Sequence, residues 1–166
     1  VIEAINTLKG NGPKDLLELC LKTASLMLIQ AKRCKDEVEA MILLKEVLES
    51  KKALNKFKEM VSYQHGDVRY IDNPNLFKLA KNIIPVKTKT VGYVKKIDAK
   101  ALGIISMKLG GGRLTKDDII DHSVGIVLNK KIGDKCDCNE ILVYLYANNE
   151  VEETLIEEVY NAYQIV

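Results

Sequence analysis

Lys108-Leu-Gly-Gly-Gly-Arg113, followed directly by Leu114-Thr-Lys-Asp-Asp-Ile-Ile-Asp-His-Ser-Val-Gly-Ile-Val-Leu-Asn-Lys-Lys-Ile-Gly-Asp134, is the most specific stretch of this chain. Three consecutive glycines predict a loop, because glycine loses the most conformational freedom when it is ordered in a helix or strand. Thr115 and Asp118 have the spacing of a capping box and predict a short helix after the loop. The apolar run that follows predicts a strand over residues 126–128, and Lys130–Asp134 predicts a turn.

The glycine loop, residues 108–113, has two readings. Its backbone N–H groups, together with Arg113, are suited to hold an anion. Alternatively, the glycines let the chain pass close to another backbone while Arg113 pairs with a nearby carboxylate. We favour the structural reading, because no catalytic group accompanies the loop in the sequence.

The elements on either side of the loop predict a small sheet with two helices. Residues 86–97 alternate apolar or β-branched residues with lysine, which is typical of an exposed strand. A short helix is expected over residues 98–107, with Asp98 as its N-cap. Residues 140–147 have high β-propensity and predict a strand. The apolar spacing after them predicts a closing helix over residues 148–163.

The N-terminal part of the chain has helical periodicity and predicts a cluster of helices. Gly10 follows the first of them, where glycine favours a helix end. The second helix carries apolar residues around most of its circumference, so we expect it to be buried on nearly every side, with Cys20 as a small buried thiol. The Met and Leu stripe of the third helix is expected to be core. The four helices are predicted over residues 1–8, 13–33, 36–49 and 51–63.

A change of composition separates this helical part from the sheet. Residues 68–85 mix polar and apolar residues and contain Pro74 and Pro85, so they are interpreted as a linker. The predicted organisation is therefore a helical segment over residues 1–67, a linker over 68–85 and a small domain over 86–166.

Composition and charge exclude several functions. The chain has 25 basic and 23 acidic residues, a net charge of +2, and two phenylalanines with no tryptophan. This balance provides no dominant field for nucleic acid or an anionic membrane and no stacking platform for single strands. No apolar run approaches the roughly 20 residues that span a bilayer, and the first residues do not resemble a signal peptide. We expect no nucleic-acid partner, no membrane partner and a cytoplasmic location.

The residues that could carry chemistry form no catalytic constellation. The sequence contains no nucleophile elbow, no Walker-type phosphate loop and no zinc-protease motif. His65, in a Gln-His-Gly-Asp sequence after the fourth helix, is interpreted as structural, with Gly66 as the expected helix C-cap. Cys136 and Cys138 form a C-x-C pair, but no second pair supplies the other ligands of a tetrahedral zinc site.

Residues 132–146 have the rhythm of a biotinyl- or lipoyl-type hairpin, in which a Gly-Asp turn precedes a strand pair. The carrier lysine of such domains lies in a turn after the second strand, where this chain has Ala147-Asn-Asn-Glu150. A swinging-arm role is therefore disfavoured, although the sheet architecture is compatible with such a domain. A non-enzymatic barrel-sandwich binding or carrier-like module remains the alternative function.

Two separated motifs resemble the C-terminal part of the pyrimidine-nucleoside (thymidine) phosphorylase family. They are Glu3-Ala-Ile-Asn-Thr-Leu-Lys-Gly-Asn-Gly-Pro-Lys-Asp-Leu-Leu-Glu-Leu-Cys20, and the glycine loop together with Asp121–Asp134. The resemblance implies an α/β fold class: a helical end of a large α/β domain, followed by a small α+β C-terminal domain of barrel-sandwich (hammerhead-like) type. It also implies part of a pentosyltransferase that reversibly converts a pyrimidine nucleoside and phosphate into free base and (deoxy)ribose 1-phosphate.

The resemblance further implies how little of the active site this chain holds. The family's catalytic and phosphate-binding motifs lie upstream of anything that matches Val1, so no catalytic or substrate-binding residue is expected here, and the chain alone is expected to be inactive. Glu3 matches a family glutamate that helps to bind a monovalent cation such as potassium, with Ile2 in place of the usual lysine beside it. Gly111 replaces a common alanine. The family implies a homodimeric parent that binds pyrimidine nucleoside and phosphate.

Overall fold

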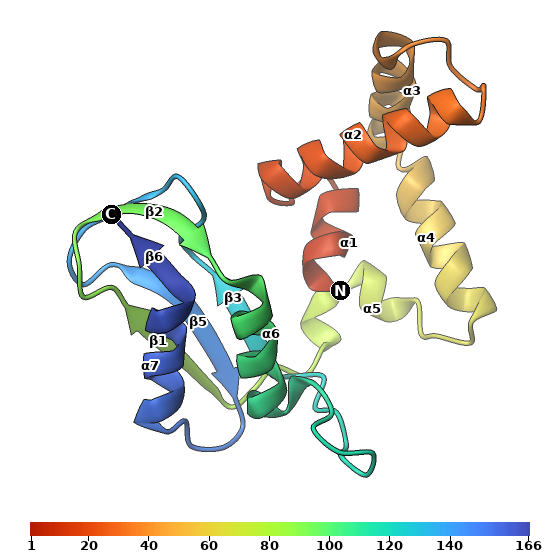
Figure 1. Ribbon diagram of the computed structural model, residues 1–166. Helices are drawn as coiled ribbons and strands as arrows, with labels where there is room; N and C mark the ends of the chain where they lie inside the picture. Colours follow the sequence, from red (N-terminus) through yellow and green to blue (C-terminus); the bar gives the residue numbers. More distant parts are fainter. The chain divides into compact units, whose positions relative to one another are not determined.

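The computed structural model describes residues 1–166, which form two compact units, Val1–Phe77 and Lys78–Val166 (Figure 1). The boundary between the units falls inside residues 68–85, the range interpreted as a linker. Most of this range is structured, because it contains a short helix α5 (Arg69–Asp72), a 3-10 turn η1 (Pro74–Leu76) and the start of the first strand.

The first unit is helical, as its periodicity predicts. Asp36 caps the third helix as its side chain accepts a hydrogen bond from the Glu39 N–H at 2.9 Å. Gly10 adopts φ +88° after the first helix, which confirms its predicted role at the helix end. The helices are α1 (Ile2–Leu8), α2 (Lys14–Gln30), α3 (Glu37–Glu49) and α4 (Lys52–Tyr63).

A small apolar core holds this unit together. Ile5 of α1, Leu54 of α4 and Ile71 of α5 are buried against one another. The rings of Tyr70 and Phe77 meet edge to face, with centroids 4.9 Å apart. Burial of large apolar side chains at about 25 cal/mol per Å² is the main stabilising term for such a cluster.

The predicted burial of α2 and of the α3 stripe is wrong for this chain. Ser25 is the buried residue of α2, whereas Met27 is 64% exposed and Cys20 is exposed. On α3, the Met and Leu residues of the predicted core stripe are only half-buried, and Val38 is 71% and Ile42 is 66% exposed. Helix α3 contacts both α2 and α4, but these contacts leave several large apolar side chains of α2 and α3 exposed.

The end of α4 also differs from the prediction at one residue. His65, not Gly66, adopts the left-handed conformation, with φ +60°. The His65 N–H donates to the Ser62 carbonyl and the Gly66 N–H donates to the Val61 carbonyl, which is the hydrogen-bond pattern of a Schellman motif. Gly66 is needed for a different reason, because a Cβ at this position would lie 2.7 Å from Cγ1 of Val61.

The second unit contains two three-stranded antiparallel sheets, in the orders β1-β5-β3 and β4-β2-β6, and two helices. The helices lie side by side over the strands (Figure 1). Val143, Leu145 and Val159 are among the buried residues of its core. The elements are β1 (Asn82–Lys87), β2 (Gly92–Ile97), α6 (Ala99–Ser106), β3 (Gly125–Leu128), β4 (Lys135–Cys136), β5 (Ile141–Ala147), α7 (Glu153–Ala162) and β6 (Tyr163–Ile165).

Three predicted elements of this unit are confirmed. Helix α6 is capped by Asp98, whose side chain accepts from the Ala101 N–H at 3.0 Å. Strands β3 and β5 occupy the predicted ranges and pair with each other. Because β5 lies between β1 and β3, its residues 142, 143, 145 and 147 are buried.

The single strand predicted over residues 86–97 is wrong, because β1 ends at Lys87 and β2 starts at Gly92 in the other sheet. The hydroxyl of Thr88 closes the intervening turn: it donates to the Thr90 carbonyl at 2.8 Å and accepts from the Thr90 N–H at 3.1 Å. The alternation of apolar and polar residues in the sequence does not reveal a turn that a side chain closes between two strands.

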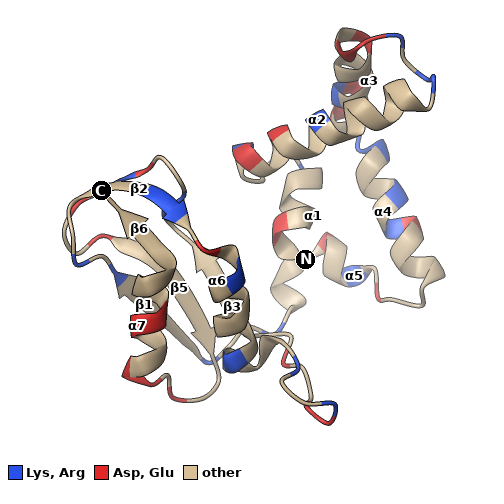
Figure 2. Cartoon of the chain, viewed as in Figure 1, with Lys and Arg blue, Asp and Glu red and all other residues tan.

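The closing helix is shorter than predicted. Helix α7 starts at Glu153 rather than near residue 148, and the chain ends in strand β6, which pairs with β2. Helix α7 carries acidic residues and no basic one (Figure 2). None of the helices in the structure combines the length and the apolar character needed to cross a bilayer.

Candidate functional site

The first part of the glycine loop lies in a π-type turn, η2 (Met107–Gly111), which follows α6. Gly110 adopts φ +102°, which an L side chain rarely tolerates. A Cβ on Gly111 would lie 3.0 Å from the Ser106 carbonyl oxygen, and a Cβ on Gly112 would lie 2.5 Å from Cγ of Met107. The glycines therefore allow the loop to fold closely onto the end of its own helix.

The charged residues of the loop behave differently from each other. Lys108 forms an ion pair with Glu158 of α7, with Nζ 2.6 Å from Oε1. Arg113 is exposed and makes no hydrogen bond or ion pair. The prediction that Arg113 pairs with a carboxylate is wrong, because the basic residue of the loop that forms an ion pair is Lys108.

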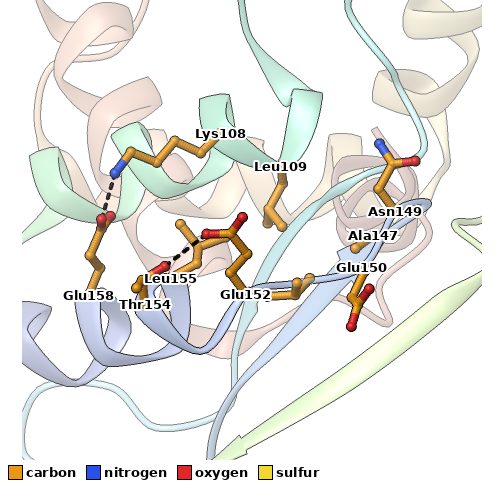
Figure 3. A pocket seen from close by; sticks show the side chains of 10 residues that line it. Lys108, Leu109, Ala147, Asn149, Glu150, Glu152, Thr154, Leu155 and Glu158 are labelled. Atoms are coloured by element: carbon orange, nitrogen blue, oxygen red, sulfur yellow. Dashed lines mark hydrogen bonds and ion pairs between the residues drawn. The ribbon is translucent and has the colours of Figure 1, made fainter.

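A cavity of about 380 Å³ lies between the glycine loop and the connection from β5 to α7 (Figure 3). The Lys108–Glu158 ion pair lies on one side and Asn149 and Glu150 lie on the other (Figure 3). Glu152 accepts a hydrogen bond from the Thr154 hydroxyl at 3.2 Å. With three glutamates and one lysine in its lining, the cavity has an acidic character that does not suit a free phosphate.

Three polar side chains, of Asp121, Ser123 and Asn148, meet where β5 ends and β3 begins. One carboxylate oxygen of Asp121 accepts from the Ser123 N–H at 2.9 Å and from the Ser123 hydroxyl at 2.6 Å. Its other oxygen accepts from Nδ2 of Asn148 at 2.6 Å. These hydrogen bonds, with those from Ser123 as the largest cause, lower the pKa of Asp121 to about 2.

Residues 114–118 form a turn instead of the predicted short helix. The Asp118 carboxylate accepts from the N–H groups of Leu114 and Thr115 and from the Thr115 hydroxyl, each at 2.8 Å. The spacing recognised as a capping box is thus used, but the acid closes a local turn and no helix follows. These hydrogen bonds lower the pKa of Asp118, with the Thr115 N–H as the largest cause.

The other residues singled out from the sequence make no hydrogen bond to this network. Glu3 is exposed in the first turn of α1, where its backbone carbonyl accepts from the Thr7 hydroxyl at 2.8 Å. Cys136 is buried and Cys138 is exposed. Burial raises the pKa of the Cys136 thiol. No group of three or more His, Cys, Asp or Glu side chains in the chain could hold a metal ion.

Sequence reasoning missed the roles of Asp121, Ser123 and Asn148. Asp121-His-Ser123 has the spacing of an Asx-type turn, in which a carboxylate accepts from the N–H two residues later. Asn148 follows a strand at a position where asparagine commonly binds backbone. These local signals predict turns, but they do not predict that residues 27 positions apart meet.

Comparison with known proteins gives a family match for most of the second unit. Residues 93–166 match the family model described as pyrimidine nucleoside phosphorylase C-terminal domain. Most of the second unit is thus similar to the C-terminal domain of this enzyme family, and the resemblance inferred from the two motifs is confirmed.

Two named relatives extend the similarity over both units. The chain is 46% identical over 165 residues to the pyrimidine-nucleoside phosphorylase of Bacillus subtilis, covering 99% of this chain and 38% of that protein. It is 45% identical over 156 residues to a pyrimidine-nucleoside phosphorylase of Staphylococcus aureus, covering 94% of this chain and 36% of that protein. The chain thus spans less than two fifths of the length of these relatives.

Proposed function

We propose that this chain functions as the C-terminal portion of a pyrimidine-nucleoside phosphorylase. The proposed whole enzyme reversibly converts a pyrimidine nucleoside and phosphate into free base and (deoxy)ribose 1-phosphate. One observation carries the proposal: the 46% identity to the Bacillus subtilis enzyme continues over 165 residues and through both units. In this proposal the cationic and hydrogen-bonding groups that stabilise the transferred sugar and phosphate lie outside the chain.

The proposed contribution of this chain is structural and conformational. The helices of the first unit complete the packing of the nucleoside-binding domain, and the second unit forms the small C-terminal domain. The two three-stranded sheets of that unit support a barrel-sandwich architecture as the finer description. Binding of nucleoside and phosphate, the homodimeric state of the whole enzyme and its cytoplasmic location remain predictions.

A chimera tests this proposal directly. Residues 1–166 would replace the matching portion of the Bacillus subtilis enzyme, and phosphorolysis of uridine and thymidine would be measured. We expect an active chimera and no turnover by the 166-residue chain alone. A folded chimera without activity, or measurable turnover by the chain alone, would contradict the proposal.

Glu3 is proposed to contribute a ligand to a monovalent cation site, with potassium as the ion. A carboxylate oxygen suits a hard cation, and the Glu3 side chain is exposed and available. Because no cluster of acidic, histidine or cysteine residues surrounds it in this chain, the other ligands have to come from other parts of the enzyme.

The same chimera tests this role. We expect Glu3→Gln to raise the potassium concentration needed for half-maximal activity by about tenfold, the effect of losing one charged ligand worth about 1.4 kcal/mol. Glu18→Gln, at an exposed acid of α2, is the matched control. An unchanged potassium dependence in Glu3→Gln would remove Glu3 from the proposed site without affecting the proposed reaction.

A further inference from the structure

Asn148 makes hydrogen bonds in two directions. Its Oδ1 accepts from the backbone N–H of Lys81 at 2.8 Å. Its Nδ2 donates to the Asp121 carboxylate at 2.6 Å and to Oγ of Ser123 at 2.8 Å. A backbone N–H only donates and an ionised carboxylate only accepts, so these partners determine which way the amide points.

The partners of Asn148 belong to segments that lie far apart in the sequence. Lys81 immediately precedes β1, three residues after the second unit begins at Lys78. Asp121 is joined to the glycine loop, because its N–H donates to the Gly110 carbonyl at 2.9 Å. Lys81, Asp121, Ser123 and Asn148 are named here the Asn148 junction.

Three residues of the junction are half-buried, and Lys81 is exposed. Asp121, Ser123 and Asn148 are each partly shielded from solvent, and no buried polar side-chain atom of the chain lacks a partner. Lys78 lies near enough to Asp121 to help lower the pKa of its carboxyl. The segment Lys78–Lys81 therefore interacts with Asn148 through a backbone hydrogen bond and with Asp121 through charge.

We propose that the Asn148 junction couples the segment through which the chain enters the second unit to the conformation of the glycine loop. An amide group is planar, with its acceptor on one side and its donor on the other, so it cannot turn toward one partner without losing the other. Displacement of Lys78–Lys81 thus moves Nδ2 of Asn148 away from the Asp121 carboxylate. Asp121 in turn holds the glycine loop, because its backbone N–H donates to the Gly110 carbonyl. Asn148 is a positioning residue for the glycine loop, whatever reaction a longer protein catalyses.

Asp121→Asn tests this coupling in the whole 166-residue chain. The new amide presents an Nδ2 to the Nδ2 of Asn148, and two donors repel each other. Asn148 then relieves the conflict by rotating, which places its own Nδ2 against the Lys81 N–H. We expect the amide of Lys81, which has no direct contact with residue 121, to exchange its hydrogen about tenfold faster, the effect of losing one typical hydrogen bond.

A reciprocal exchange of the two side chains provides the rescue. In Asp121→Asn with Asn148→Asp, one oxygen of the new carboxylate accepts from the Lys81 N–H and the other accepts from the amide at position 121. We expect the Lys81 and Ser123 amides to return to the exchange rates of the unchanged chain. A merely structural loss at position 121 would not be repaired by a second substitution at position 148.

Asp117→Asn is the matched control, because it removes the same charge from the same segment and Asp117 makes no hydrogen bond in the structure. Exchange would be measured residue by residue by NMR, with strands β2 and β6 as the internal reference for global stability. Faster exchange at Ser123 with an unchanged Lys81 would overturn the proposal, and so would failure of the double substitution to restore Lys81.

Discussion

At the scale of single residues, the ionisation of Asp121 is the most informative property of the candidate site. Its carboxylate accepts three hydrogen bonds, from Ser123 twice and from Asn148. The ionised form is therefore favoured in the folded chain, and the pKa falls from 3.8 to about 2. A group with a lowered folded pKa adds stability above its unfolded pKa and loses it as the pH falls toward its folded pKa.

The lowered pKa of Asp121 leads to a prediction about how stability depends on pH. Asp121→Asn removes the charge that the junction stabilises, so the variant is expected to unfold at a lower urea concentration than the unchanged chain near neutral pH. The difference in urea midpoint is expected to shrink as the pH falls from about 4 toward about 2, because the unchanged chain then loses the same charge. Urea unfolding at about pH 7 and about pH 3 measures it.

Asp117→Asn serves again as the comparison, since it removes a carboxylate that makes no hydrogen bond in the structure. If the Asp121→Asn difference stayed constant between neutral and acidic pH, the hydrogen bonds to Asp121 would not depend on its charge. The origin of its low pKa would then be wrong.

At the scale of elements, two glycines of the second unit have opposite roles. Gly92 starts β2 with φ +158°, and a Cβ there would lie 2.5 Å from the carbonyl oxygen of Val166, the residue after β6. Gly103 lies within α6, where a Cβ would meet no atom within 4 Å. Glycine is thus required where the β6 backbone approaches β2 and is only a weakness within the helix.

Alanine substitutions are expected to separate these roles. Gly92→Ala is expected to lower the free energy of unfolding by about 1–3 kcal/mol, because the strand or the C-terminal residue has to shift. Gly103→Ala is expected to raise it by about 0.4–1 kcal/mol, because alanine restricts the unfolded chain and suits a helix. Denaturant unfolding of both variants at one temperature measures these changes. Equal effects of the two substitutions would contradict the close approach at Gly92.

At the scale of the whole molecule, the chain has two apolar cores that share no residue. Ile5 is fully buried in the core of the first unit, and Leu145 is fully buried in that of the second. Each core is small enough that one large-to-small substitution removes a sizeable part of its stability, since such changes cost about 2–5 kcal/mol.

Two substitutions therefore predict unit-specific destabilisation. Ile5→Ala is expected to speed amide exchange in residues 1–77 while residues 78–166 keep their protection, and Leu145→Ala is expected to do the reverse. Hydrogen exchange followed by mass spectrometry of peptides from each range reports this. Ile42→Thr is a control, because Ile42 is exposed and such changes usually alter stability by less than about 0.5 kcal/mol. Loss of protection in both units from either core substitution would show that they unfold as one.

Several features follow from sequence alone because their causes are local. Hydrophobic spacing placed the four N-terminal helices, strands β3 and β5, and helix α6 with its Asp98 cap, since propensity and capping act over a few residues. The order of the two motifs, the first from Glu3 to Cys20 and the second from the glycine loop to Asp134, identified the enzyme family. Periodicity could not show that the apolar faces of α2 and α3 are exposed, because it describes a face and not what covers it.

Only the tertiary structure showed that Asn148 meets Asp121 and the Lys81 N–H, and that the residues around Thr88 form a turn between two sheets. These contacts join positions that are distant in the sequence, and their energies depend on the distance and direction between atoms rather than on residue type. The glycine loop shows the difference between what the sequence predicts and what the tertiary structure determines. Its composition predicts a loop, but packing on α6 and the hydrogen bond from Asp121 determine its conformation.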